Sequence, residues 1–274
     1  MMMTNLFAFA ESVPSKTVQA TGWFLETAWL IPALPALSFF LILFFGKKMK
    51  YKGAEFGITA IALSLILAIC CAGQWINQVD NASENYSKAQ YETEEKYDDA
   101  KNLDSEATAT TEIVEVASSE DISLYAAGEN DEGYEAVAVD AVIERFTWWE
   151  SGGKKFQVGI MVDGLTVMML FVVTVISLLV HIYSTDYVSG DRRYTHYFAF
   201  LSLFSASMLF FVLSENILQT IVGWELVGVC SFALIGHWWE EKPNSDAALK
   251  AFLTNRVGDM GLLVGMIILF WSAG

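Results

Sequence analysis

Four charged side chains lie inside long apolar runs in the second half of the sequence. Glu225 lies within residues 216–239, and Lys250, Arg256 and Asp259 lie within residues 247–273. An ionised group is costly in a membrane, so such residues generally have a function there. Loss of solvent favours the protonated form of a carboxylate, which can then take up and release a proton. These residue types therefore indicate proton transfer across an apolar layer.

The spacing of the three residues in the last run predicts their directions on a helix. Arg256 and Asp259 are three residues apart, so they lie on one face and are able to pair. Lys250 lies nine residues before Asp259 and points in nearly the opposite direction. We expect Glu225, the ion pair and Lys250 to form a proton relay. A purely structural carboxylate at position 225, and a lysine that extends to the membrane surface, are the alternatives.

Other kinds of chemistry have little support in the sequence. The three histidines, His181, His196 and His237, lie near the ends of apolar runs, where a histidine at the membrane surface is ordinary. Their spacing does not suggest a metal site. The sequence has no glycine-rich phosphate loop, no haem or iron–sulfur signature and no nucleophile triad. We therefore expect no metal, no bound cofactor and no redox step on this chain.

The apolar runs predict the elements that position these charges. A bilayer core of about 30 Å needs roughly 20 apolar residues of helix. About six runs meet this length, and they are residues 27–46, 57–76, 164–185, 194–214, 216–239 and 247–273. At 1.5 Å per residue, Glu225 lies about 13.5 Å into its run, close to the membrane centre. The predicted fold class is an all-α polytopic membrane protein.

Nearly all of the negative charge belongs to one polar segment. The 274-residue chain has a net charge of −16, and residues 77–157 alone carry 20 acidic and 6 basic residues. This local acidity gives no basis for a nucleic-acid partner. The predicted domains are residues 1–76 with two helices, an acidic and partly disordered insertion at 77–157, and residues 158–274 with four helices. A β-hairpin is expected at about 145–161, around Gly152 and Gly153.

Basic residues in the short loops predict the orientation of the chain. The cytoplasmic loops of membrane proteins carry an excess of lysine and arginine. Three loops on the same predicted side carry such residues, so we place that side in the cytoplasm and the acidic insertion outside. The residues are Lys47, Lys48, Lys50, Lys52, Arg192, Arg193 and Lys242.

Several motifs resemble those of a known family. Residues 162–166 (VDGLT), 223–231 (GWELVGVCS) and 249–259 (LKAFLTNRVGD), with Pro32-Ala33-Leu34-Pro35 near the start, are similar to the large antiporter-like subunit of respiratory complex I. That subunit is chain L, or chain 5, of proton-pumping NADH–quinone oxidoreductase. The resemblance is specific from about residue 162 onward and looser before it.

The resemblance implies a proton-pumping translocase subunit driven by quinone reduction elsewhere in the complex. It implies that Glu225 is the central protonatable residue and that Arg256 and Asp259 adjust it. NADH, FMN, iron–sulfur clusters and quinone would belong to other subunits of respiratory electron transport. The partners would be other membrane subunits of complex I, and the location a bacterial-type inner membrane. Family members have many more spans, so we expect an N-terminal fragment or a split gene product. The acidic insertion is also longer than the loop that family members have between the second and third helices.

Two other functions remain open from the sequence. The large subunit of an Mrp-type sodium/proton antiporter shares the surroundings of Glu225 and Lys250. A membrane anchor that displays an acidic outer domain would account for the insertion, but it gives no role to a carboxylate near the membrane centre. The form of residues 255–259 favours complex I.

Overall fold

The computed structural model describes residues 17–49, 51–82, 84, 138–151 and 154–273. The chain divides into two compact units, Met1–Gln19 with Asn77–Asp140, and Ala20–Ile76 with Ala141–Gly274. In the first unit, strand β1 (Thr17–Gln19) pairs in parallel with β2 (Ala138–Asp140). Most of the predicted acidic insertion lies outside the described residues, so its boundaries stay a prediction.

Six helices in the described residues are long and apolar enough to cross a membrane. They are α2 (Leu30–Phe45), which continues as a 3-10 turn (Gly46–Lys48), α3 (Ala54–Asp80), α6 (Gly164–Tyr187), α7 (Tyr194–Val212), α8 (Ile217–Ile235) and α9 (Lys242–Ala273). A short helix, α1 (Trp23–Glu26), precedes them. The predicted class of an all-α polytopic membrane protein is confirmed.

The boundaries of several helices differ from those predicted from apolar runs; α3, for example, covers Ala54–Asp80 where the sequence predicts 57–76. The run 216–239 ends as a helix at Ile235. Its last residues form a turn in which the backbone N–H of His237 donates to the carbonyl of Leu234. The helix predicted at 247–273 begins earlier, at Lys242, and Pro243 lies in its first turn. Proline is tolerated there because the first backbone N–H groups of a helix have no partner within it.

Side-chain caps fix the start of two helices. The Asp163 side chain accepts a hydrogen bond of 2.7 Å from the backbone N–H of Thr166, which begins α6. The Asn216 side chain accepts one of 2.9 Å from the N–H of Gln219, which begins α8. Each cap satisfies one of the unpaired N–H groups at a helix start. The caps therefore fix where these helices leave the polar loops.

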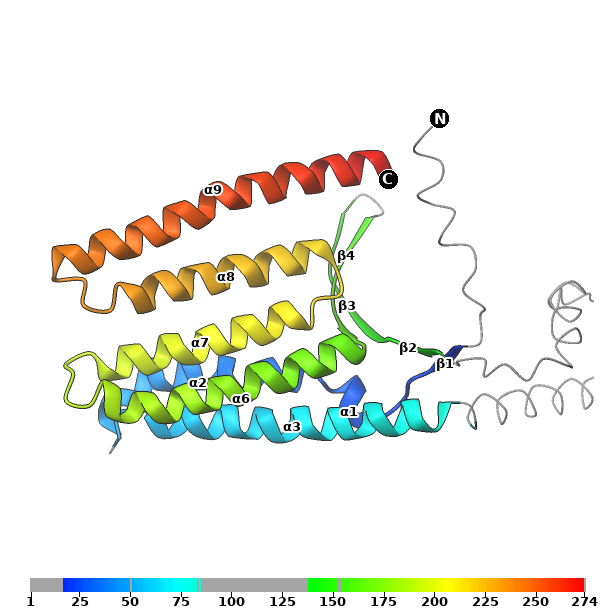
Figure 1. Cartoon of the computed structure of the whole chain (residues 1–274), viewed down its shortest axis with the longest axis horizontal. Helices are drawn as coiled ribbons and strands as arrows, with labels where there is room; N and C mark the ends of the chain where they lie inside the picture. The colour runs from blue at the N-terminus through cyan, green and yellow to red at the C-terminus, as the bar shows by residue number, and fades with distance from the viewer. Residues whose placement is uncertain (1–16, 50, 83, 85–137, 152–153, 274) are drawn as a thin grey trace, which may run out of the picture. The chain divides into compact units, whose positions relative to one another are not determined.

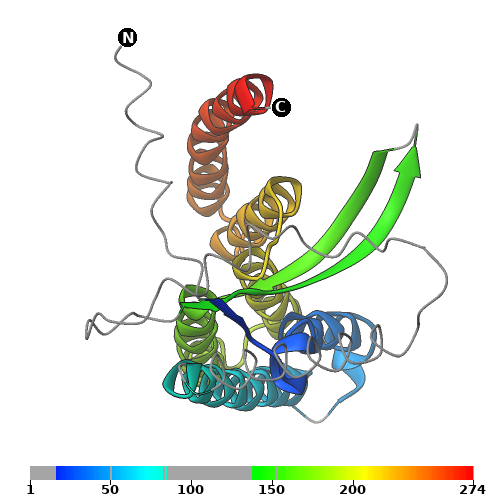
Figure 2. The ribbon, with the colours of Figure 1, turned by 90° about the vertical axis from the view of Figure 1, so that its right-hand side faces the viewer.

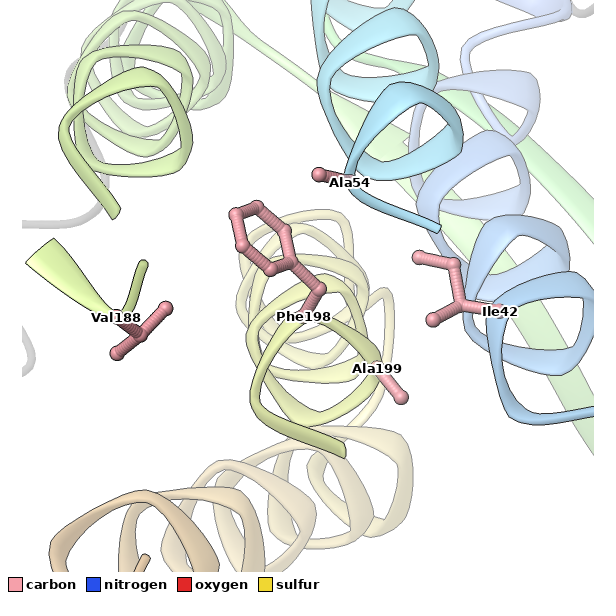
Figure 3. Packing of buried hydrophobic residues seen from close by; sticks show 5 residues of the cluster. All are labelled: Ile42, Ala54, Val188, Phe198 and Ala199. Carbon is pink, nitrogen blue, oxygen red and sulfur yellow. The ribbon is translucent and has the colours of Figure 1, made fainter. Parts of the chain in front are cut away.

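Helix α7 lies at the centre of the bundle. It packs against α2, α6 and α8, and α9 packs against α8 (Figure 1). A core cluster joins α2, α3 and α7 near the loop after α6, and Figure 3 shows Phe198 of α7 among its other members, Ile42, Ala54, Val188 and Ala199. Large apolar side chains cover much of the outer surface, as expected where helices face lipid.

A β-hairpin lies at the opposite end of the bundle from the α6–α7 and α8–α9 loops (Figure 1). Strands β3 (Val142–Ser151) and β4 (Lys154–Val162) pair antiparallel at the position where the sequence predicts a hairpin. Figure 2 shows the hairpin extending sideways from the helices. Its base is attached to the α7–α8 connection, where the N–H of Met161 donates to the carbonyl of Leu213.

Candidate functional site

Three of the four predicted charges, Glu225, Arg256 and Asp259, lie along the contact between α8 and α9. The α9 residues that face α8 recur at helical spacing, and each meets a residue of α8. Ala248 lies against Gly236, and the rings of Phe252 and Phe232 lie 5.4 Å apart. Because the two helices run antiparallel, the same α9 face then reaches Glu225. The apolar contacts near the loop thus set the register of the charged residues beyond them.

The position of α8 depends on a close contact with α7 at Gly223. A Cβ atom at this residue would lie 2.9 Å from the Cα of Phe211. Real Cβ atoms essentially never approach that closely, so glycine allows the two backbones to meet here. The next two residues, Trp224 and Glu225, then point toward α9. In the run Gly223-Trp224-Glu225, a glycine that allows close helix packing is therefore followed by two side chains that contact α9.

Arg256 is shared between two carboxylates. Its Nη1 donates to Oε2 of Glu225, and the same nitrogen lies 3.6 Å from Oδ2 of Asp259. The guanidinium carbon also lies 4.8 Å from the ring centre of Phe252, within the range of a cation–π contact. The structure thus brings three of the four predicted residues together, with one cation between two acids.

Asp259 has a further partner that the sequence analysis did not identify. The indole N–H of Trp224 donates to Oδ1 of Asp259 at 2.7 Å, so each oxygen of this carboxylate has its own partner. The side chain of Asp259 is 11% exposed, whereas those of Glu225 and Arg256 are 30% and 35% exposed. The only sign of this contact in the sequence was a tryptophan next to Glu225. Asp259 is therefore the fixed acid of the pair, and Glu225 is the open one.

Lys250 is not part of this cluster. Its side chain is exposed on α9, and no ion pair forms between it and any other residue in the described ranges. This agrees with the opposite directions predicted for Lys250 and Asp259. A cavity of about 140 Å³ adjoins Glu225, Arg256 and Asp259, which gives the guanidinium room to move between its acids. No group of three potential metal ligands occurs among the described residues.

Two of the three histidines are more buried than the sequence indicates. His196 is exposed, but His181 is 0% and His237 is 8% exposed. Neighbouring segments of the chain enclose these two side chains, which the apolar runs did not indicate; their depth in the membrane stays a prediction. His237 follows the end of α8, and its Nε2 lies 3.4 Å from Oδ2 of Asp191 in the α6–α7 loop.

The loop pair has shifted protonation equilibria. Burial lowers the pKa of His237 below its usual 6.5, although Asp191 opposes the shift. The backbone N–H of Arg193 holds the pKa of Asp191 below 3.8, and the Trp238 indole also donates to this carboxylate, at 2.6 Å. This contact joins the α6–α7 and α8–α9 loops at one end of the bundle.

The sequence matches two family models over the part that contains these charges. Residues 148–198 match the model described as NADH-ubiquinone oxidoreductase (complex I), chain 5 N-terminus. Residues 214–274 match the model described as NADH:quinone oxidoreductase/Mrp antiporter, transmembrane. The resemblance to complex I chain 5 is confirmed. Both models lie in the second half of the chain, and all four predicted site residues lie in the second one.

Curated relatives agree with this family. NAD(P)H-quinone oxidoreductase chain 5 of Synechocystis sp. is 46% identical over 127 residues, which are 46% of this chain and 19% of that protein. Chloroplastic subunit 5 of Physcomitrium patens is 47% identical over 49% of this chain and 19% of its own length. That of Mesostigma viride is 49% identical over 47% and 20%. The aligned part thus spans about a fifth of these chain 5 relatives.

A solved structure has a similar fold. A chain of the membrane-bound sulfane sulfur reductase, an archaeal respiratory membrane complex, matches with a TM-score of 0.55 and 14% identity. The match covers 88% of this chain and 36% of the other. At this identity the likeness concerns the fold alone. This match extends beyond residues 148–198 and 214–274, which the two family models cover.

Proposed function

We propose that this chain belongs to a proton-translocating membrane subunit of a complex I-type NADH– or NAD(P)H–quinone oxidoreductase. The observation that carries the proposal is the single cation, Arg256, placed between Glu225 and Asp259 in a membrane-spanning helix pair. The chain 5 relatives support the type of complex. The enzyme activity is that of the whole complex, in which this chain contributes proton transfer.

Proton release from Glu225 would depend on where Arg256 points. When the guanidinium bonds to Glu225, the ionised carboxylate is stabilised and a proton leaves. When Arg256 moves fully to Asp259, Glu225 loses its counter-charge and takes up a proton, because an unpaired charge is costly in a membrane. Asp259 stays in place through the Trp224 indole. The cluster therefore couples a movement of one side chain to the binding and release of one proton.

Lys250 would act at a different surface of α9. It lies outside the cluster and is exposed, so it is placed to interact with a segment other than α8. We assign it to the transfer of protons toward or away from the Glu225 cluster. The cofactors, NADH, FMN, iron–sulfur clusters and quinone, would lie in other subunits. This chain would supply proton binding and hold no redox group.

The proposed partners are other membrane subunits of the complex and the lipid bilayer, in a bacterial-type inner membrane. The proposed orientation follows from the basic loops, which face the cytoplasm, so that the hairpin end of the bundle lies on the opposite side of the membrane. Cysteines placed at Thr147 and Ser189 in a background without native cysteines test it, because both positions are exposed and they lie at opposite ends of the bundle. We expect an impermeant thiol reagent to label Thr147→Cys, but not Ser189→Cys, in intact cells. Labelling of Ser189→Cys would reverse the orientation.

The test of function is Glu225→Gln in the full-length protein within its assembled complex. Glutamine keeps the shape and hydrogen bonding but cannot ionise, so we expect pumping to fall by about 10²-fold, as for loss of a positioned proton carrier. Glu225→Asp should be milder. Protons pumped per NADH oxidised in membrane vesicles is the measurement. Glu215→Gln is the matched control, because Glu215 pairs with Arg145 beside the hairpin. Normal pumping by Glu225→Gln would refute the proposal.

The family model for residues 214–274 also covers Mrp antiporters, which keeps a sodium/proton antiporter subunit as the second candidate. The two functions predict different couplings. A complex I subunit should pump only while NADH is oxidised. An antiporter subunit should instead exchange protons for sodium across vesicles without any electron donor.

A further inference from the structure

A second set of buried and half-buried polar side chains lies between α3, α6 and α7. It begins near the end of α6 and the start of α7, close to the loop between them, where the hydroxyls of Ser184 and Tyr197 lie 3.2 Å apart. Deeper in the bundle, the hydroxyls of Ser177 and Ser205 lie 2.5 Å apart. His181 lies between these two pairs along α6. We call these residues, together with Ser202, the α6–α7 seam.

The seam extends from the loop end of the bundle to the middle of the membrane. His181 is six residues before the end of α6, which corresponds to a depth of about 9 Å at 1.5 Å per residue. Ser205 is eleven residues after the start of α7, or about 16 Å deep. A bilayer core is about 30 Å thick, so Ser205 lies close to its centre. The seam is thus long enough to form half of a path across the membrane.

His181 has one nitrogen bonded and one nitrogen without a partner. Its Nδ1 lies 2.8 Å from the carbonyl oxygen of Ser177, to which a protonated Nδ1 donates. Nε2 is then an acceptor. Nε2 is buried and has no hydrogen-bond partner among the described residues. A structural histidine of this burial normally has both nitrogens paired.

The hydroxyl of Ser202 is in the same situation and lies at the same place. Ser202 is 0% exposed, and its Oγ also lacks a partner in the part of the chain that the structure describes. Both groups lie against Gly57 of α3. A Cβ atom at residue 57 would lie 3.0 Å from Ser202 Oγ and 3.5 Å from His181 Nε2. Two unpaired polar atoms of α6 and α7 thus meet at a glycine of α3.

From this arrangement we infer that His181 and Ser202 form a second proton-binding site within the membrane, apart from the Glu225 cluster. A hydroxyl serves both protonation states of the imidazole. It donates to Nε2 when the ring is neutral, and it accepts from Nε2–H when the ring is charged. The neighbouring hydroxyl pairs, Ser177 with Ser205 and Ser184 with Tyr197, would extend the path toward the membrane centre and the loop end.

The groups around His181 are neutral. Phe198 of α7 packs 6.2 Å from the imidazole ring centre, and Tyr197 is the titratable side chain of α7 that enters the seam. Gly57 is the contact from α3, and Glu55 on that helix bonds to the backbone of Tyr51 instead. His181 forms no ion pair in the described ranges. Since no carboxylate stabilises its charged form, a proton would be held briefly and passed on.

The use of this site in pumping rests on the proposed function, whereas proton exchange at His181 is measured separately. The experiment uses the full-length protein in its complex, with ¹⁵N-labelled histidine. Infrared difference spectra between the resting and the turning-over complex report protonation of imidazole. We expect a histidine signal that His181→Gln removes. In the His181→Gln complex, the number of protons pumped per NADH oxidised should fall by about tenfold or more.

Two further variants keep the inference testable if His181→Gln does not assemble. Ser202→Ala leaves the imidazole but removes the hydroxyl that we propose accepts from Nε2–H, so the pH at which pumping is half-maximal should move to a lower value. Gly57→Ala should have a similar effect by separating the two groups. Ser64→Ala is the control, because this equally buried serine of α3 donates to the carbonyl of Ile31, outside the seam. It should keep the original pH profile.

The results separate this inference from the proposed function. Loss of pumping in Glu225→Gln, together with unchanged pumping, pH profile and histidine spectra in the His181 and Ser202 variants, would overturn the inference alone. Normal pumping in Glu225→Gln, with loss of the histidine signal and of pumping in His181→Gln, would support the inference and reject the role of Glu225.

Discussion

The two polar regions of the bundle use opposite electrostatic designs. At the α8–α9 contact, two acids share one cation, and the side chains of Glu225 and Arg256 remain about one third exposed. In the α6–α7 seam the groups are neutral, and His181 and Ser202 are completely buried. A charge within a membrane needs a counter-charge, while hydroxyls and a neutral imidazole need only hydrogen bonds. The comparison suggests that charge is stored in the first region and protons are conducted in the second.

The largest difference should appear when one member of the charged cluster is removed. Asp259→Asn leaves Arg256 with Glu225 as its only acid, so the guanidinium holds Glu225 in its ionised form and slows proton uptake. We expect a loss of pumping of about tenfold or more, since a group that stays ionised cannot act as a proton carrier. Pumping per NADH, with assembly of the complex measured separately, provides the comparison.

The double change Arg256→Leu with Asp259→Leu sharpens this test. It removes both the cation and its second acid, so no cation is left to hold Glu225 in its ionised form. The loss should therefore be smaller than that of Asp259→Asn alone. A double variant that pumps less than the single one would show that Arg256 is needed for its own charge. In that case, an Arg256 held permanently on Glu225 would not be the cause of the loss in Asp259→Asn.

A smaller effect is expected at Trp224. Trp224→Phe keeps an aromatic ring beside Phe211 but removes the N–H that donates to Asp259. A hydrogen bond to a charged group contributes about 1.5–3 kcal/mol. Without it, the carboxylate of Asp259 should be less firmly positioned, and Arg256 should bond to Glu225 more of the time. Pumping should fall by roughly three- to tenfold, with the complex still assembled. Trp238→Phe, which removes an indole donor at the loop end, should leave pumping nearly unchanged.

The smallest effect concerns stability at the loop end, outside both regions. His237 has a lowered pKa in the folded protein, so below about 6.5 the unfolded chain binds the proton more readily. The stabilising contribution of neutral His237 is complete above pH 6.5 and is lost as pH falls from there toward the folded-state pKa. Asp191 adds a loss at still lower pH, below 3.8.

Thermal unfolding of the full-length protein in detergent between pH 5 and 7 measures this dependence. His237→Gln should flatten the curve over this interval. His196→Gln is the control, because His196 is exposed and its loss should leave the slope intact. An equal slope in the protein with native His237 and in His237→Gln would show that other groups cause the acid sensitivity.

Much of the fold could be predicted because membrane spans follow from apolar length alone. Each predicted run corresponds to a helix that is long and apolar enough to cross a membrane. The ends of the helices could be predicted less well. The apolar run, for example, continues past Ile235, whereas α8 ends there. Likewise, an ion pair between Arg256 and Asp259 follows from their spacing on one helix. The second ion pair, between Arg256 and Glu225, depends on how α8 and α9 pack.

The sequence by itself determined the spans, the family resemblance and the charged residues, because ionisable groups are conspicuous within apolar runs. Only the tertiary structure decided which polar groups meet. Trp224 reaches Asp259 because Gly223 brings α8 against α7 and turns this side chain toward α9. Similarly, Gly57, His181 and Ser202 come from three helices, and no local spacing connects them. Helix period fixes the face on which a side chain lies, whereas packing between helices fixes its partner.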